Sequence, residues 1–178
     1  QEFVNCNSQA TLLYCANQAS ITPHVWLSTK KHLSYPDKMI YDLDPPEGNF
    51  DVVRKCAKDL RKLFDELGLT AFLQTTGSAG VHVVLPIDGK SSFDEVRKFA
   101  ADVADLLARR EPESYTVETL KEKRKKRLFI DYLRNSYGQT AVAPYSVRAR
   151  KGAPVATPLD WNEIGSKDRV GEIVKRAQ

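Results

Sequence analysis

The order of strand-like and helix-like segments in the middle of the chain is the feature that most constrains its fold. Two long segments carry apolar residues at three- and four-residue spacing, which is typical of amphipathic helices. Four short segments rich in aliphatic and aromatic residues end at proline or glycine turns, which is typical of strands. In chain order we predict a strand over 38–43, a helix over 51–67, strands over 71–75 and 81–85, a helix from Phe93, and a strand over 128–132.

The resulting series, β-α-β-β-α-β, is that of the ferredoxin-like or RRM-like α+β fold, with both helices on one face of the sheet. Right-handed crossovers place strand 38–43 between strands 81–85 and 128–132, antiparallel to both. Ser92 and Glu95 form a capping box that should begin the second helix. We expect residues 151–178 to form a C-terminal extension, a loop followed by one or two short helices from about Asp160. The chain 1–178 is expected to be a single domain.

Alternation of side chains along each strand predicts which residues share a face of the sheet. Asp42, Asp44, His82 and Asp131 should all lie on the face opposite the helices, which we expect to be open. They come from three strands that converge at one point, and this favours a functional site over solvated acids. The apolar residues expected to face the helices are Met39, Tyr41, Leu43, Val81, Val83, Leu85, Leu128 and Ile130.

The paired aspartates point to a cation. Asp42 and Asp44 end an apolar strand, and two like charges so close are costly unless a cation neutralises both. Hard oxygen ligands of this kind suit Mg²⁺ or Mn²⁺. Together with Asp131 they have the layout expected for two divalent ions in phosphoryl transfer, one activating a 3′-hydroxyl and one holding a triphosphate. The alternative for an isolated pair of this kind is a strand that runs into a Pro-Pro turn with solvated acids.

The segment after the second strand has the composition of a phosphate-binding turn. Residues 76–80 read Thr-Gly-Ser-Ala-Gly, and their N–H groups and hydroxyls could surround phosphate oxygens. The same residues are common in any hairpin turn. His82 follows directly and could donate a hydrogen bond to a phosphate, or it could be a structural histidine.

Composition sets wider limits on function. The 178 residues carry 27 basic and 23 acidic side chains, a net charge of +4 that is compatible with nucleic acid. Cys6, Cys15 and Cys56 are odd in number and lack CxxC spacing, so neither a zinc knuckle nor a disulfide framework is indicated. No apolar run approaches the length of a membrane span. We expect a soluble protein inside the cell with no membrane partner.

Several short motifs, taken in order, resemble those of the archaeo-eukaryotic primase superfamily. The closest resemblance is to the polymerase domain of ligase D, the non-homologous end-joining ligase of bacteria and archaea, and it covers about residues 23–164. The motifs that carry it are Asp42-Leu-Asp-Pro45, Thr76-Gly-Ser-Ala-Gly-Val-His82, Phe129-Ile-Asp131-Tyr followed by Asn135, Pro144-Tyr-Ser-Val-Arg148, Gly152-Ala-Pro-Val and Thr157-Pro-Leu-Asp-Trp161.

The resemblance implies a site and an activity. Asp42, Asp44 and Asp131 would be the catalytic triad that holds two Mn²⁺ or Mg²⁺ ions. The activity would be a nucleotidyltransferase that adds nucleotides, preferably ribonucleotides, to DNA 3′ ends in end-joining repair. The residues expected to bind the incoming nucleotide are Thr76, Ser78, His82, Arg148, Arg134 and His24.

The resemblance also implies partners and shows departures. The partners would be nucleoside triphosphates, primer–template DNA with a 5′-phosphate, a DNA ligase and Ku, in the cytoplasm at the nucleoid. Ala79 stands where a lysine or arginine commonly meets the triphosphate, and Arg134, in place of a frequent glutamine, could restore that charge. The family usually has about a hundred residues before the position of Gln1, so we expect the catalytic core to be only weakly active by itself.

One basic segment and one alternative function stay open. Residues 121–127 include Lys123, Arg124, Lys125 and Lys126, which could form a solvated loop or follow a DNA backbone. The alternative function is a non-catalytic, RRM-like nucleic-acid-binding module. RRM sheets place aromatic side chains on their open face, whereas acids are expected here.

Overall fold

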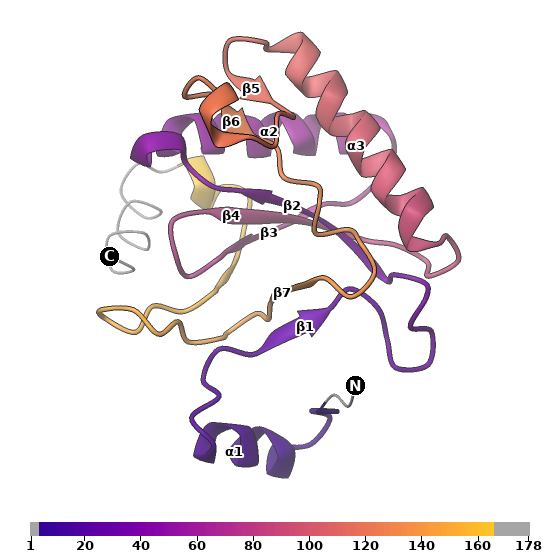
Figure 1. Ribbon diagram of the computed structural model, residues 1–178, viewed down its shortest axis with the longest axis vertical. Coiled ribbons are helices and arrows are strands. Elements are labelled where there is room, and N and C mark those ends of the chain that lie inside the picture. Colours follow the sequence, from indigo (N-terminus) through magenta and orange to yellow (C-terminus); the bar gives the residue numbers. More distant parts are fainter. Residues whose placement is uncertain (1–3, 166–178) are drawn as a thin grey trace.

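A computed structural model describes residues 4–165 of the chain as a mixed α/β structure. Figure 1 shows helices on one side of a central sheet and a small two-stranded ribbon on the other. The elements are α1 (Gln9–Asn17), β1 (His24–Trp26), β2 (Lys38–Leu43), the 3₁₀ turn η1 (Pro46–Gly48), α2 (Phe50–Glu66), β3 (Phe72–Thr75), β4 (Val81–Pro86), α3 (Phe93–Arg110), β5 (Tyr115–Thr116), η2 (Lys121–Lys123), β6 (Leu128–Phe129), β7 (Thr140–Val142), β8 (Pro158–Leu159) and η3 (Glu163–Gly165).

The central sheet has the strand order β2-β4-β3-β8, and all its pairs are antiparallel. In the β2–β4 pair, Asp42 lies directly opposite His82. This pairing confirms the predicted neighbours of the first strand on one side, and it confirms the α+β class. It also fixes an acid and an imidazole side by side on the same face of the sheet.

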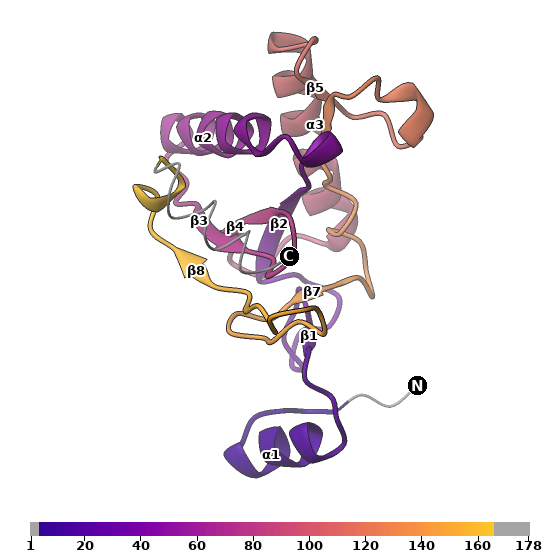
Figure 2. The same cartoon turned by 90° about the vertical axis from the view of Figure 1, so that its left-hand side faces the viewer.

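Both long helices cover the predicted face. Asn49 caps α2 by accepting from the N–H of Asp51, and Ser92 with Glu95 forms the predicted capping box at α3. The core between helices and sheet contains all eight apolar strand residues that the alternation assigned to it: Met39, Tyr41, Leu43, Val81, Val83, Leu85, Leu128 and Ile130. Figure 2 shows α2 above the sheet and the β1–β7 ribbon below it.

The predicted fourth strand is shorter than expected. Only Leu128–Phe129 is a strand (β6), and it pairs in parallel with β5 outside the central sheet. The chain then reaches β2 through one antiparallel bridge, in which the N–H of Asp42 donates to the carbonyl of Asp131 at 2.9 Å. The prediction of 128–132 as a full sheet strand was therefore wrong, but its position beside β2 was right.

The side chain of Asn135 makes hydrogen bonds to the backbone of β2 that a neighbouring strand would otherwise make. Its Oδ1 accepts from the N–H of Ile40 at 2.8 Å, and its Nδ2 donates to the carbonyls of Ile40 and Tyr132, each at 2.8 Å. Asn135 is fully buried, so these bonds satisfy backbone groups that water cannot reach. The amide thus fixes the segment after Asp131 against β2.

The face opposite the helices is not open, as we had expected it to be. The β1–β7 ribbon packs over part of it and forms a second small core of Leu27, Ile40, Phe93 and Ala141. As a result Asp42 is 6% exposed and His82 is 3% exposed. Of the three predicted acids, Asp42 is therefore buried and Asp131 half-buried, whereas Asp44 stays exposed.

The described chain begins with the exposed helix α1 and ends with the short turn η3. No residue of α1 is buried, and the helix lies away from the body of the protein in Figures 1 and 2. At the C-terminal end the predicted loop was wrong in part, because it contains β8, which pairs with β3 in the central sheet. The 3₁₀ turn η3 supports the expectation of a short helix after Asp160, and residues 166–178 of the predicted extension lie outside the described residues. None of the helices in residues 4–165 has the length and apolar composition needed to cross a bilayer.

We expect Asn135→Ala to lower the free energy of unfolding by about 2–3 kcal/mol, because it leaves buried N–H and C=O groups of Ile40 without partners. Urea unfolding followed by circular dichroism measures this loss. Asn17→Ala, on the exposed helix α1, is the matched control and should cost much less. Equal losses for the two variants would contradict the role given to the Asn135 amide.

Candidate active site

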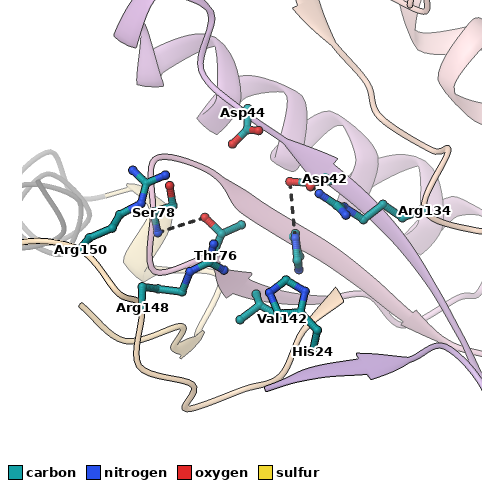
Figure 3. Close-up of a pocket in the computed structure, with 10 residues that line it drawn as sticks. His24, Asp42, Asp44, Thr76, Ser78, Arg134, Val142, Arg148 and Arg150 are labelled. Atoms are coloured by element: carbon teal, nitrogen blue, oxygen red, sulfur yellow. Dashed lines mark hydrogen bonds and ion pairs between the residues drawn. The ribbon is translucent and has the colours of Figure 1, made fainter. Parts of the chain in front are cut away.

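A cavity of about 190 Å³ lies at the end of β2, between the central sheet and the β1–β7 ribbon. Figure 3 shows Asp42 and Asp44 along one side of the cavity, with Ser78, Arg148 and Arg150 across from them. All six residues that the sequence assigned to nucleotide binding line it. The full lining is His24, Asp42, Asp44, Thr76, Ser78, His82, Arg134, Val142, Arg148 and Arg150.

Asp42 is the most enclosed acid of the site. Its Oδ2 accepts from Nε of Arg134 at 2.7 Å, and its Oδ1 lies 3.5 Å from Nε2 of His82. The second distance is too long for a full hydrogen bond, and Oδ1 has no hydrogen-bond partner among the described residues. Burial acts to raise the pKa of Asp42, but the contact with His82 and the charge of Arg134 outweigh it, so that the pKa is lowered.

Asp44 and Asp131 differ from Asp42 in that their pKa values are raised. Burial raises the pKa of Asp44, and the negative charge of Asp42 adds to the increase. Burial also raises the pKa of Asp131, against the lowering effect of a 2.8 Å hydrogen bond from the N–H of Leu133 to its Oδ1. Both carboxylates are thus held where a nearby cation would stabilise their ionised form.

The three acids share a second groove of about 510 Å³, which runs along the other side of Asp42. Within residues 4–165, however, no three acidic, histidine or cysteine side chains already form a metal-binding cluster. One oxygen of Asp42 accepts from Arg134, and one of Asp131 accepts from the N–H of Leu133. Like charges also repel one another in the absence of a cation.

The turn 76–80 has a more structural role than we predicted. The hydroxyl of Thr76 donates to the carbonyl of Gly80 and accepts from the N–H groups of Ser78 and Gly80. One donor and two acceptor positions are all that a hydroxyl has, so Thr76 shapes the turn and has no free group for a phosphate. Of the two predicted hydroxyls, that of Ser78 is the one left to face the cavity.

Glycines allow the turn to approach its neighbours closely. A Cβ built at Gly80 would lie 2.5 Å from Oδ1 of Asp44, and one at Gly77 would lie 2.8 Å from Cγ of Arg148. Gly77 also has a φ of +63°, which favours glycine. The two positions therefore determine how near an acid and an arginine of the cavity lie to the turn.

Cationic side chains line the wall across from the acids. Arg148 was predicted, whereas Arg150 and Val142 were missed. Arg150 reaches the cavity because the chain turns after Arg148, with the N–H of Arg150 donating to the carbonyl of Arg148 at 2.8 Å, and no local pattern in the sequence signalled this turn. His24 lines the same cavity, and burial followed by the charges of Arg148 and Arg134 lowers its pKa.

The basic segment 121–127 forms one wall of the second groove. Arg124 and Lys126, two of the four residues predicted to bind nucleic acid, line it, together with Lys121 and Arg127. Lys123 and Lys125 are exposed and do not line the groove. Arg124 stacks 4.2 Å above the ring of Phe129, and Lys126 pairs with Glu47 at 3.2 Å. The groove thus has acids along one side and a basic segment along the other.

The donors present fit divalent cations of the Mg²⁺ and Mn²⁺ type. The decisive feature is Oδ1 of Asp42, a buried carboxylate oxygen that makes no hydrogen bond and lies 3.5 Å from Nε2 of His82. A contact of that length satisfies the oxygen incompletely, and a bound cation would satisfy it better. Asp44 and Asp131 add oxygen ligands in the same groove, and oxygen is the donor these ions prefer.

Comparisons with known proteins agree with the motif resemblance. The family described as LigD, primase-polymerase domain, matches residues 1–176. A multifunctional non-homologous end-joining protein LigD of Pseudomonas aeruginosa is 38% identical over 89% of this chain and 19% of its own length. A bifunctional LigD of Bacillus subtilis is 32% identical over 93% of this chain and 27% of its own length. The chain therefore spans about a fifth to a quarter of these curated relatives.

A solved structure agrees as well. The polymerase domain from Mycobacterium tuberculosis ligase D, in complex with DNA, superposes with a TM-score of 0.80 at 28% identity. The match covers 96% of this chain and 64% of that one. The fold, the motifs and the family match lead to the same conclusion: this chain belongs to the family of LigD primase-polymerase domains.

Proposed function

We propose that this chain is the catalytic core of a metal-dependent nucleotidyltransferase that extends DNA 3′ ends in end-joining repair. The observation that carries the proposal is that Asp42 and Asp44 line both a cavity with arginines and a groove with a basic segment, and that Asp131 joins them in the groove. One space has the size and charge for a triphosphate, and the other suits a DNA strand. The acids lie where the two would meet.

In this proposal the cavity binds the incoming nucleoside triphosphate. Arg148 and Arg150 bind phosphate oxygens, for which the fixed charge and forked donors of arginine are well suited. The hydroxyl of Ser78 donates to the same phosphates, and His82 keeps Asp42 in place from the neighbouring strand. A preference for ribonucleotides is part of the proposal, which the family resemblance supports.

The groove then holds the 3′ end of the primer. Arg124, Lys126 and Arg127 would contact backbone phosphates, so that binding weakens as salt rises. The reaction joins the 3′ oxygen to the α-phosphorus and releases pyrophosphate. Mn²⁺ or Mg²⁺ bound at Asp42, Asp44 and Asp131 would activate the 3′-hydroxyl and neutralise charge on the triphosphate. A 5′-phosphate on the template side, a DNA ligase and Ku remain proposed partners.

The alternative of an RRM-like binding module receives less support from the sheet. Modules of that kind stack two or three bases on aromatic side chains. On the corresponding face Asp42 and His82 are central, and the exposed aromatic residue there is Phe72 on β3. Binding of DNA without any nucleotide transfer would favour this alternative.

We expect Asp131→Asn to lower primer extension with Mn²⁺ and ribonucleotides by about 100-fold or more, because a charge that stabilises the reaction is lost. The substitution keeps an oxygen that can accept from Leu133, so the melting temperature should change little. Asp105→Asn, on the far side of α3, is the control and should extend primers normally. Retention of extension by Asp131→Asn would contradict the proposed site.

Two variants, Arg148→Ala and Lys126→Ala, should distinguish nucleotide binding in the cavity from DNA binding in the groove. Loss of an arginine–phosphate contact weakens nucleotide binding by about 10- to 100-fold, whereas DNA binding should change far less. Lys126→Ala should instead weaken DNA binding and reduce its salt dependence. Fluorescence anisotropy with labelled nucleotide and labelled primer–template measures both. If Arg148→Ala weakened the two equally, Arg148 would be a DNA contact.

A further inference from the structure

We propose that Arg134 is a built-in competitor of the divalent ions, because its guanidinium holds an oxygen of Asp42 that a second ion needs. The proposal deepens the proposed function and rests on it. Its consequence is that metal loading and triphosphate binding are coupled through the position of one arginine side chain.

The contact between Arg134 and Asp42 is short and enclosed. Nε of Arg134 lies 2.7 Å from Oδ2 of Asp42, whose side chain is only 7% exposed. A charge-assisted hydrogen bond in such a setting is much stronger than one between exposed groups. The arginine thus supplies the positive charge that the buried carboxylate requires when no metal ion is bound.

The two oxygens of Asp42 differ in their availability. Oδ2 accepts a hydrogen bond from Arg134, whereas Oδ1 has no hydrogen-bond partner among residues 4–165 and makes only the longer contact of 3.5 Å with Nε2 of His82. A carboxylate can offer one oxygen to each of two cations. With Arg134 in place, only Oδ1 of Asp42 would be open to a cation, and use of both oxygens would require Arg134 to release Oδ2.

A guanidinium released from Asp42 could turn into the cavity that Arg134 already lines. A second contact of Arg134 is long, 3.4 Å from its Nη1 to the carbonyl of Thr140, and its side chain is 37% exposed. Arg134 also lines the cavity that contains Arg148 and Arg150. Turning from Asp42 to a triphosphate would keep its charge paired, so each ligand should raise the affinity for the other.

The test compares Mn²⁺ binding to the whole chain and to its Arg134→Gln variant by calorimetry, without nucleotide or DNA. We expect Arg134→Gln to bind Mn²⁺ about tenfold more tightly, a difference of about 1.4 kcal/mol. In EDTA the same variant should melt at a lower temperature, because Asp42 has lost its counter-charge, and Mn²⁺ should restore the loss. Arg109→Gln, which removes an exposed pair with Asp105 on α3, is the control.

The variant Arg134→Lys and the addition of a triphosphate provide two further tests of the proposal. Arg134→Lys retains the charge but not the forked donors, and its Mn²⁺ affinity should fall between those of the wild type and Arg134→Gln. Addition of a triphosphate should tighten Mn²⁺ binding more in the wild type than in Arg134→Gln. Equal or weaker Mn²⁺ binding by Arg134→Gln would overturn this proposal alone. Absence of Mn²⁺ binding in every variant would overturn it together with the proposed function.

Discussion

The backbone pairing of Asp42 on both sides of β2 is the constraint on which the rest of the site depends. On one side Asp42 lies opposite His82 of β4, and on the other its N–H donates to the carbonyl of Asp131. Three segments far apart in the sequence therefore meet at one residue. Any shift of register by one position would turn the carboxylate of Asp42 into the core beneath the helices.

Around this point the charges are arranged in three layers. Acids lie in the middle, arginines line the cavity on one side, and the basic segment 121–127 borders the groove on the other. The buried acid is stabilised by Arg134 and His82, while Asp44 and Asp131 keep raised pKa values. Such a centre is costly without a cation, and this cost supports the proposal that divalent ions and phosphates bind there.

Much of this arrangement could be predicted from sequence, because local patterns determine it. The helical spacing, the capping box at Ser92 and the alternation along β2 and β4 placed the core correctly. The six predicted nucleotide-binding residues do line one cavity. These features depend on spacing within single elements or on short motifs in fixed order.

The features that could not be predicted depend on contacts between distant residues. The β1–β7 ribbon pairs residues more than a hundred positions apart, and it is what encloses Asp42 and His82. The amide of Asn135 replaces a strand that periodicity had extended too far. The hydroxyl of Thr76 is used within its own turn, and Arg134 contacts Asp42 before any phosphate is present.

The most direct test of the proposed centre is anomalous X-ray scattering from crystals soaked with Mn²⁺ and a non-hydrolysable ribonucleoside triphosphate. We expect Mn²⁺ peaks within bonding distance of the carboxylate oxygens of Asp42, Asp44 and Asp131, with the triphosphate beside Arg148. Mn²⁺ at other positions, or a nucleotide bound away from these carboxylates, would contradict the assignment of this site as a nucleotidyltransferase centre.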